Sequence, residues 1–129
     1  MKKYLLTTIA ILSLNTYVFA SPYPTNIEGK YDCNSIEVGT HVNYVGVMTL
    51  KKTGQTYAVK STFNDGSTYD GVGIYNEAMH SFSIAFINPK EAKETGVAIA
   101  DVKKDYAMSA VWTYLNNAEI GNSSCTKRA

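Results

Sequence analysis

Apolar and polar residues alternate along most of the chain beyond residue 40. The longest apolar file consists of Tyr106, Met108, Ala110, Trp112 and Tyr114. Shorter files of the same period lie in 41–52, 56–63 and 80–87, and the last of these holds Phe82, Ile84 and Phe86. Apolar residues at every second position place one face of a strand in a core and the other toward water. The pattern therefore predicts β-strands rather than helices.

Turn-forming residues separate these files. The segments 52–55 and 64–67 carry Gly54 and Gly66 at the positions where a hairpin needs a positive φ. Weaker turn signals occur at 76–77, 104–105 and 116–117. The segment 88–95 begins with Asn-Pro, and Pro suits the first position of a helix. We therefore expect a loop there that contains a single helical turn.

Eight strands are predicted, at about 27–34, 41–52, 56–63, 67–75, 80–87, 96–102, 106–115 and 119–126. Short, evenly spaced strands joined by hairpins are typical of an all-β, antiparallel up-and-down meander. Eight such strands close into a barrel, since closure leaves no exposed edge. The interior of a barrel of this size is either filled by side chains or holds one small ligand. The many large inward residues favour a filled interior.

The first twenty residues have the three parts of a cleavable secretory signal peptide. Lys2 and Lys3 precede an apolar stretch over 4–14, and Ala20 lies at an A-x-A-like cleavage site. An apolar run of about 11 residues is too short to span a bilayer, which needs roughly 20. We therefore expect a signal peptide over 1–20 and a single exported domain over 21–129. That domain is expected in the periplasm or the medium, without stable membrane insertion.

Charge excludes two classes of partner. The chain has 12 Lys and Arg against 11 Asp and Glu, and removal of the signal peptide takes away two of the lysines. The nearly neutral domain that remains has no basic patch for nucleic acid or for an anionic membrane surface.

Cys33 and Cys125 are the 2 cysteines of the chain. An exported chain meets an oxidising compartment, so an even count favours a disulfide over two free thiols or half a metal site. In a closed meander the first and last strands are neighbours, and these two cysteines fall on those strands. The predicted bridge therefore supports the barrel, and it stabilises the fold by about 4–5 kcal/mol through loop closure.

No catalytic, cofactor or metal site is predicted. His41 and His80 stand outside any metal-binding spacing, and the sequence has no G-x-S-x-G elbow. The alternative to a non-enzymatic protein is a hydrolase that uses carboxylates at the barrel rim. Asp70 is a candidate for the interior or the rim, and three further carboxylates fall on strands expected to be adjacent, namely Glu28, Asp32 and Glu119.

The aromatic residues are the main candidates for binding. Eight tyrosines, three phenylalanines and Trp112 follow the signal peptide. Trp112, Phe82 and Phe86 are interpreted as core residues. Tyrosine combines an apolar ring with a polar tip, which suits recognition surfaces. The candidate ligand or partner contacts are Tyr44, Tyr69, Tyr75, Trp112 and Tyr114.

Two short segments carry a resemblance, YDGVGI at 69–74 and SAVWT at 109–113. With Gly29-Lys30-Tyr31 and Thr95-Gly96-Val97, their order resembles small exported bacterial proteins with calycin-like barrels of the lipocalin and avidin type. Some of these carry a fibronectin-binding label. The chain departs from them at Ala110, where they more often have Gly, and the polar residues that hold biotin in avidins are not found. The resemblance supports the fold.

We expect an exported, non-enzymatic binding protein that contacts a host or envelope protein through its loops or an outer face. The alternatives are a small apolar ligand in the barrel mouth, the hydrolase described above, an exported inhibitor of a host lysozyme, and a structural envelope component.

Overall fold

The computed structural model describes residues 22–37 and 40–129, so the predicted signal peptide lies outside the described residues. The described part contains eight strands: β1 (Gly29–Ile36), β2 (Asn43–Thr53), β3 (Thr56–Phe63), β4 (Thr68–Asn76), β5 (Ser81–Asn88), β6 (Glu91–Val102), β7 (Met108–Tyr114) and β8 (Gly121–Lys127). No helix long and apolar enough to cross a membrane occurs in this part of the chain.

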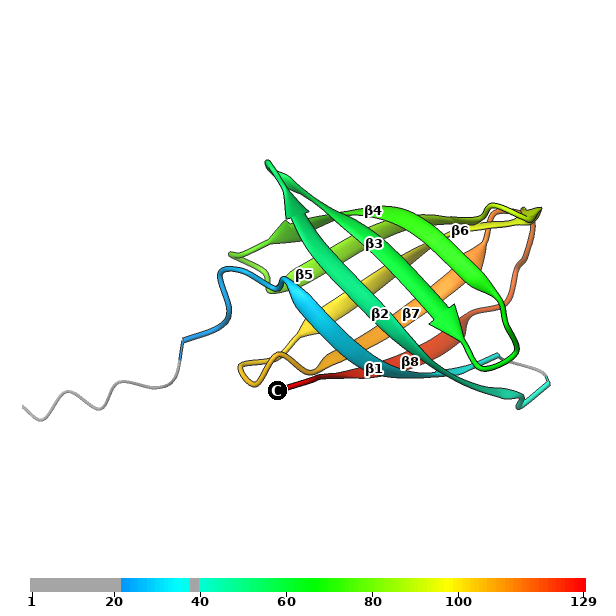
Figure 1. Cartoon of the computed structure of the whole chain (residues 1–129), viewed down its shortest axis with the longest axis horizontal. Helices are drawn as coiled ribbons and strands as arrows, with labels where there is room; N and C mark the ends of the chain where they lie inside the picture. The colour runs from blue at the N-terminus through cyan, green and yellow to red at the C-terminus, as the bar shows by residue number, and fades with distance from the viewer. Residues whose placement is uncertain (1–21, 38–39) are drawn as a thin grey trace, which may run out of the picture.

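The strands form a closed antiparallel barrel in chain order, which confirms the predicted fold (Figure 1). The β1–β8 pair closes it, with Cys33 opposite Cys125 in the register. These two residues form the predicted disulfide, which links positions 92 apart in sequence. The expected positive φ is found at Gly54 (63°) and Gly66 (85°), in the β2–β3 and β3–β4 turns.

The sequence prediction was wrong at the β5–β6 connection. Strand β6 begins at Glu91 instead of 96, and no helical turn is present. Asn88 pairs with Glu91, so Pro89 and Lys90 alone form the turn. The register then shifts, because Ile87 pairs with Thr95. Residues 92–94 form a bulge, since the partner strand has no residues to match them.

One end of the barrel is closed by the segment that precedes β1. Tyr75 donates a hydrogen bond from its hydroxyl to the carbonyl of Pro24 at 2.7 Å. The Tyr31 hydroxyl donates to the carbonyl of Ile27 at 2.7 Å, and the Ile27 amide donates to the Tyr57 hydroxyl at 3.2 Å. In Figure 1 the 22–28 segment lies at this end of the barrel, next to the start of β1. We call this end of the barrel the closed end. We call the opposite end the mouth, and it carries the β1–β2, β3–β4, β5–β6 and β7–β8 connections.

The most deeply buried core lies in the closed half of the barrel. Its largest fully buried side chains are Ile27, Tyr31, Leu50, Phe82 and Val102. Glycines on the inner face make room for large rings here. A Cβ atom added to Gly73 would lie 2.3 Å from the ring of Phe82, which occupies the space above it. The expectation of a filled interior is therefore met in this half.

Candidate functional site

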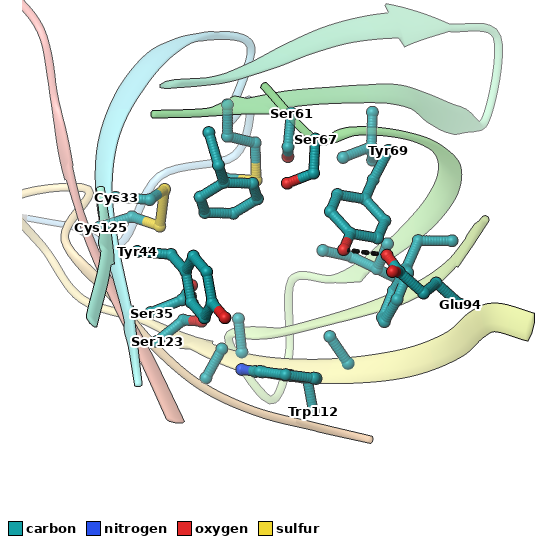
Figure 2. A pocket seen from close by; sticks show the side chains of 18 of the residues that line it. Cys33, Ser35, Tyr44, Ser61, Ser67, Tyr69, Glu94, Trp112, Ser123 and Cys125 are labelled. Carbon is teal, nitrogen blue, oxygen red and sulfur yellow. Dashed lines mark hydrogen bonds between the residues drawn. A yellow bond between two sulfur atoms is a disulfide. The ribbon is translucent and has the colours of Figure 1, made fainter. Parts of the chain in front are cut away.

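The mouth half of the barrel encloses a cavity of about 280 Å³, which we call the cup (Figure 2). This volume lies just below the range of roughly 300–1,000 Å³ for small-molecule sites. The cup is lined mainly by aromatic, small and hydroxyl side chains, which include Ser35, Tyr44, Ser61, Phe63, Ser67, Tyr69, Phe86, Ala98, Ala110, Trp112, Tyr114 and Ser123. Three carboxylates also line it, Glu37, Asp65 and Glu94. The expected filled interior is therefore not found in this half.

Five of the lining rings form a chain of edge-to-face contacts around the wall. The chain runs from Phe63 through Tyr69, Phe86 and Tyr114 to Trp112, with ring centroids 5.4–6.1 Å apart and interplanar angles of 67–88°. This geometry is the preferred one for aromatic pairs, and each pair contributes about 0.5–1.5 kcal/mol beyond burial. The rings therefore hold one another in place without a ligand.

Trp112 forms a flat part of the wall. It pairs with Gly121 of β8 across the sheet. A Cβ atom at Gly121 would lie 2.2–2.6 Å from three atoms of the indole, so the ring lies directly over this glycine. Its other face is then turned toward the cup. The indole Nε1 is covered and has no hydrogen-bond partner among the described residues. Trp112 therefore offers the cup its ring face rather than its N–H.

A polar cluster stands at the other side of the cup. The Tyr69 hydroxyl donates a short hydrogen bond to the Glu94 carboxylate, and the Asn88 amide donates to the same oxygen at 3.2 Å. The hydroxyls of Tyr69 and Tyr114 lie 3.2 Å apart. Burial raises the pKa of Tyr69, and its bond to Glu94 adds to the shift. Tyr69 therefore stays protonated and acts as a donor at neutral pH.

Two further polar groups border the cup. The hydroxyls of Ser35 and Ser123 lie 2.5 Å apart, between β1 and β8, beside the disulfide (Figure 2). The Asp65 carboxylate accepts bonds from the amide and the hydroxyl of Ser67, at 3.0 and 2.6 Å. Those bonds hold the pKa of Asp65 below its usual value, so it is ionised at neutral pH.

The structure brings together four of the five candidate contacts. Tyr44, Tyr69, Trp112 and Tyr114 all line the cup. Tyr75 does not, since it lies on the same face of β4 as Tyr69 but near the closed end, where it binds the 22–28 segment. Six residues along a strand separate the two tyrosines by about 20 Å. Periodicity identifies the face of a strand but not the end of the barrel.

The four carboxylates considered from the sequence do not form a group. Asp70 is exposed on the outer face of β4, not inside the barrel or at its rim. Asp32 is also outside, in a salt bridge of 2.8 Å with Arg128. Glu28 precedes β1 and accepts a bond from the Lys52 amide at 3.1 Å, while Glu119 lies in the β7–β8 loop.

Several residues of the cup were not predicted from the sequence as contacts. Phe86 and Trp112 were interpreted as core residues but line the cavity, whereas Phe82 is fully buried as expected. Phe63 belonged to a predicted inward file, which was the available signal for it. Glu94 fell in the predicted loop, and its inward position depends on the bulge in β6.

The described residues contain no group of three or more His, Cys, Asp and Glu side chains that could hold a metal ion. No known protein-family model matches the chain, and no curated protein matches it at a significant level.

Proposed function

We propose that this protein binds a small molecule in the cup and acts outside the cytoplasm without catalysing a reaction. The observation that carries this proposal is a cavity of about 280 Å³ in the mouth half, walled by a chain of five aromatic rings. Ligand sites are typically concave, mostly apolar and largely preformed, with a few polar groups that orient the ligand. The cup has each of these properties. The Cys33–Cys125 disulfide supports export, because such bonds persist in oxidising compartments.

The size of the cup limits the ligand. Drug-sized ligands occupy pockets of roughly 300–1,000 Å³, and the cavity of about 280 Å³ lies below that range. A ligand of about ten non-hydrogen atoms therefore fits inside, and a longer one extends through the mouth. The sequence favoured a protein partner because the inward files carry many large side chains. That expectation assumed a filled interior, whereas the cup leaves space for a ligand in the mouth half.

The test is a two-dimensional NMR titration of the purified protein with neutral and charged compounds of about ten non-hydrogen atoms. We expect bound compounds to move the Trp112 indole signal and the backbone signals of Ser61 and Ala98. Ala98→Phe places a ring in the cup and is expected to abolish the shifts. Ala85→Phe makes the same change on the exposed outer face of β5 and should leave them unchanged. Shifts that persist in Ala98→Phe, or a panel in which no compound binds, would refute a site in the cup.

A second candidate function is protein binding, and the outer face of β4–β7 favours it. In one row of the sheet, Val72, Ala85 and Val97 follow one another on the adjacent strands β4, β5 and β6. In the neighbouring row, Ile74, Ser83, Ile99 and Val111 follow one another on β4 to β7. Ile74 is 63% exposed and Ile99 is 54% exposed. Contiguous exposed apolar patches mark interaction sites.

Cross-linking on cells, followed by mass spectrometry, tests this second function. Ile99→Lys should abolish a specific cross-link, and Ile36→Lys, on the outer face of β1, should not. Equal cross-linking by both variants would exclude the β4–β7 face. Light scattering distinguishes self-association from a foreign partner.

A further inference from the structure

The charged groups that line the cup are all of one sign. Its lining contains the carboxylates of Glu37, Asp65 and Glu94, and no lysine, arginine or histidine. The acceptor bonds that Asp65 and Glu94 receive come from hydroxyl, amide and backbone N–H groups, none of which carries a positive charge. Their negative charge is therefore stabilised but not neutralised.

The rings present the same sign. The face of an aromatic ring carries the negative part of its quadrupole, and it attracts a cation within about 6 Å of the centroid. Tryptophan is the strongest of the aromatic residues in this role. Trp112 turns its face toward the cup because the opposite face covers Gly121. Tyr114 packs against Trp112 at 5.4 Å, and Tyr44 also borders the space (Figure 2).

Charge is also distributed unevenly along the barrel axis. The mouth connections and the adjoining start of β6 carry five acidic residues, Glu37, Asp65, Glu91, Glu94 and Glu119, against the two lysines at 90 and 93. The closed end carries seven basic residues, at 30, 51–52, 103–104 and 127–128, against five acidic ones. Clefts lined by one sign of charge concentrate ligands of the opposite sign and raise their association rates. The mouth therefore attracts cations and repels anions.

We propose that the ligand of the cup is a small organic cation, a quaternary ammonium or protonated amine group held against the aromatic wall and near the carboxylates. The proposal rests on the proposed function of the cup and names its ligand class. The aromatic faces favour the cation over a neutral molecule of the same shape, because only the cation interacts with the ring quadrupole. The half-buried carboxylates of Glu37 and Glu94 add attraction, because their charges are screened less than charges in water.

The test compares two molecules of matched shape. Choline carries a quaternary nitrogen, and 3,3-dimethyl-1-butanol has a carbon atom in its place. Trp112 is the single tryptophan of the chain, so its fluorescence reports directly from the cup. We expect choline to change the emission in a saturable way and the neutral alcohol to bind at least tenfold more weakly. Raising the salt concentration should weaken choline binding and leave the alcohol unaffected.

Variants separate the two contributions. Tyr114→Leu keeps an apolar side chain but removes a ring, and it should weaken choline binding much more than alcohol binding. Glu94→Gln keeps the shape of the side chain and removes its charge, and it should weaken choline binding several-fold. Glu77→Gln is the matched control in the β4–β5 turn at the closed end, and it should have no effect. Thermal melts of each variant show whether the fold is intact.

Each outcome decides a different question. Equal affinity for choline and the alcohol would overturn the cationic ligand and leave a binding site in the cup. If choline does not bind while neutral or anionic compounds in the NMR panel do, the cationic ligand is likewise wrong and the binding site in the cup remains. If no compound of either experiment binds, both the ligand class and the proposed function are wrong.

Discussion

Removing the disulfide should destabilise the barrel by an amount that follows from its position in the chain. Cys33 and Cys125 lie 92 residues apart, so the bond closes most of the described chain into one loop. The chain-entropy relation gives a loss of about 15.6 cal/mol/K for a loop of this length, or about 4.6 kcal/mol at 25 °C. A domain of roughly 110 residues unfolds with an entropy near 0.23 kcal/mol/K, so the expected fall in Tm is about 20 °C.

The assay is thermal unfolding of the oxidised protein, of the same protein after reduction, and of the Cys33→Ala/Cys125→Ala double variant. Both side chains are buried, so the double variant also loses packing. The reduced protein retains both sulfur atoms and isolates the effect of the covalent link. We expect the reduced protein to remain folded at 25 °C, because the β1–β8 pairing holds six residue pairs in register without the bond.

A fall in Tm of less than about 5 °C on reduction would refute the loop-closure argument. It would mean that the unfolded chain keeps the two ends close together, so that the bond removes little entropy. A complete loss of the barrel would refute the claim that the β1–β8 pairing alone can close it.

Three further predictions test the closed end, the wall of the cup and the buried tyrosines. Ile27→Ala should cost 2–5 kcal/mol in urea unfolding because Ile27 is fully buried, whereas Ile36→Ala on the outer face should cost less than about 0.5 kcal/mol. Gly121→Val should displace the Trp112 ring, shift its emission and destabilise the fold by about 1–3 kcal/mol, and emission like that of the unsubstituted protein would contradict this. Burial raises the pKa of Tyr31 and of Tyr69 in the folded chain, so their contribution to stability is present below about pH 10 and is lost as the pH rises above it. Absorbance at 295 nm should show these two tyrosines ionising only on unfolding, and Tyr69→Phe should flatten the fall in urea midpoint above pH 10.

The sequence predicted the fold because its signals are local. Alternation in each segment identified the inward files, and Gly54 and Gly66 identified two of the turns. The cysteines supplied the one long-range constraint, since they lie on the strands that close the barrel. The error at 88–95 has a local cause as well. Pro89 was interpreted as the start of a helical turn, but it lies in the two-residue turn of the β5–β6 hairpin. Residues 92–94, which have no partners on β5, form a bulge after that turn.

The cup was harder to predict because it depends on which residues face one another across strands. Tyr44 and Tyr114 were named as contacts on residue type alone. Phe86 and Phe82 belong to the same inward file, yet one lines the cup and the other lies in the core. Their different roles depend on distance from the closed end, which no period in the sequence encodes. The inward position of Glu94 depends on a register shift that sequence periodicity did not predict.

The placement of the inward glycines explains how a barrel with so many large inward residues keeps an open half. Gly46 lies below Phe63, Gly96 below Phe86 and Gly121 below Trp112, with ring atoms 2.2–2.7 Å from where a Cβ atom would be. Each ring therefore lies along the wall, over its glycine, instead of extending across the barrel. At the closed end the 22–28 segment supplies the additional side chain of Ile27, and the space is filled. At the mouth, no side chain among the described residues fills the space as Ile27 does at the closed end. The same arrangement of rings over glycines therefore leaves a cavity there. An aromatic wall with its faces turned inward and an acidic rim then border the cavity, and this arrangement is the basis for the organic cation proposed above as its ligand.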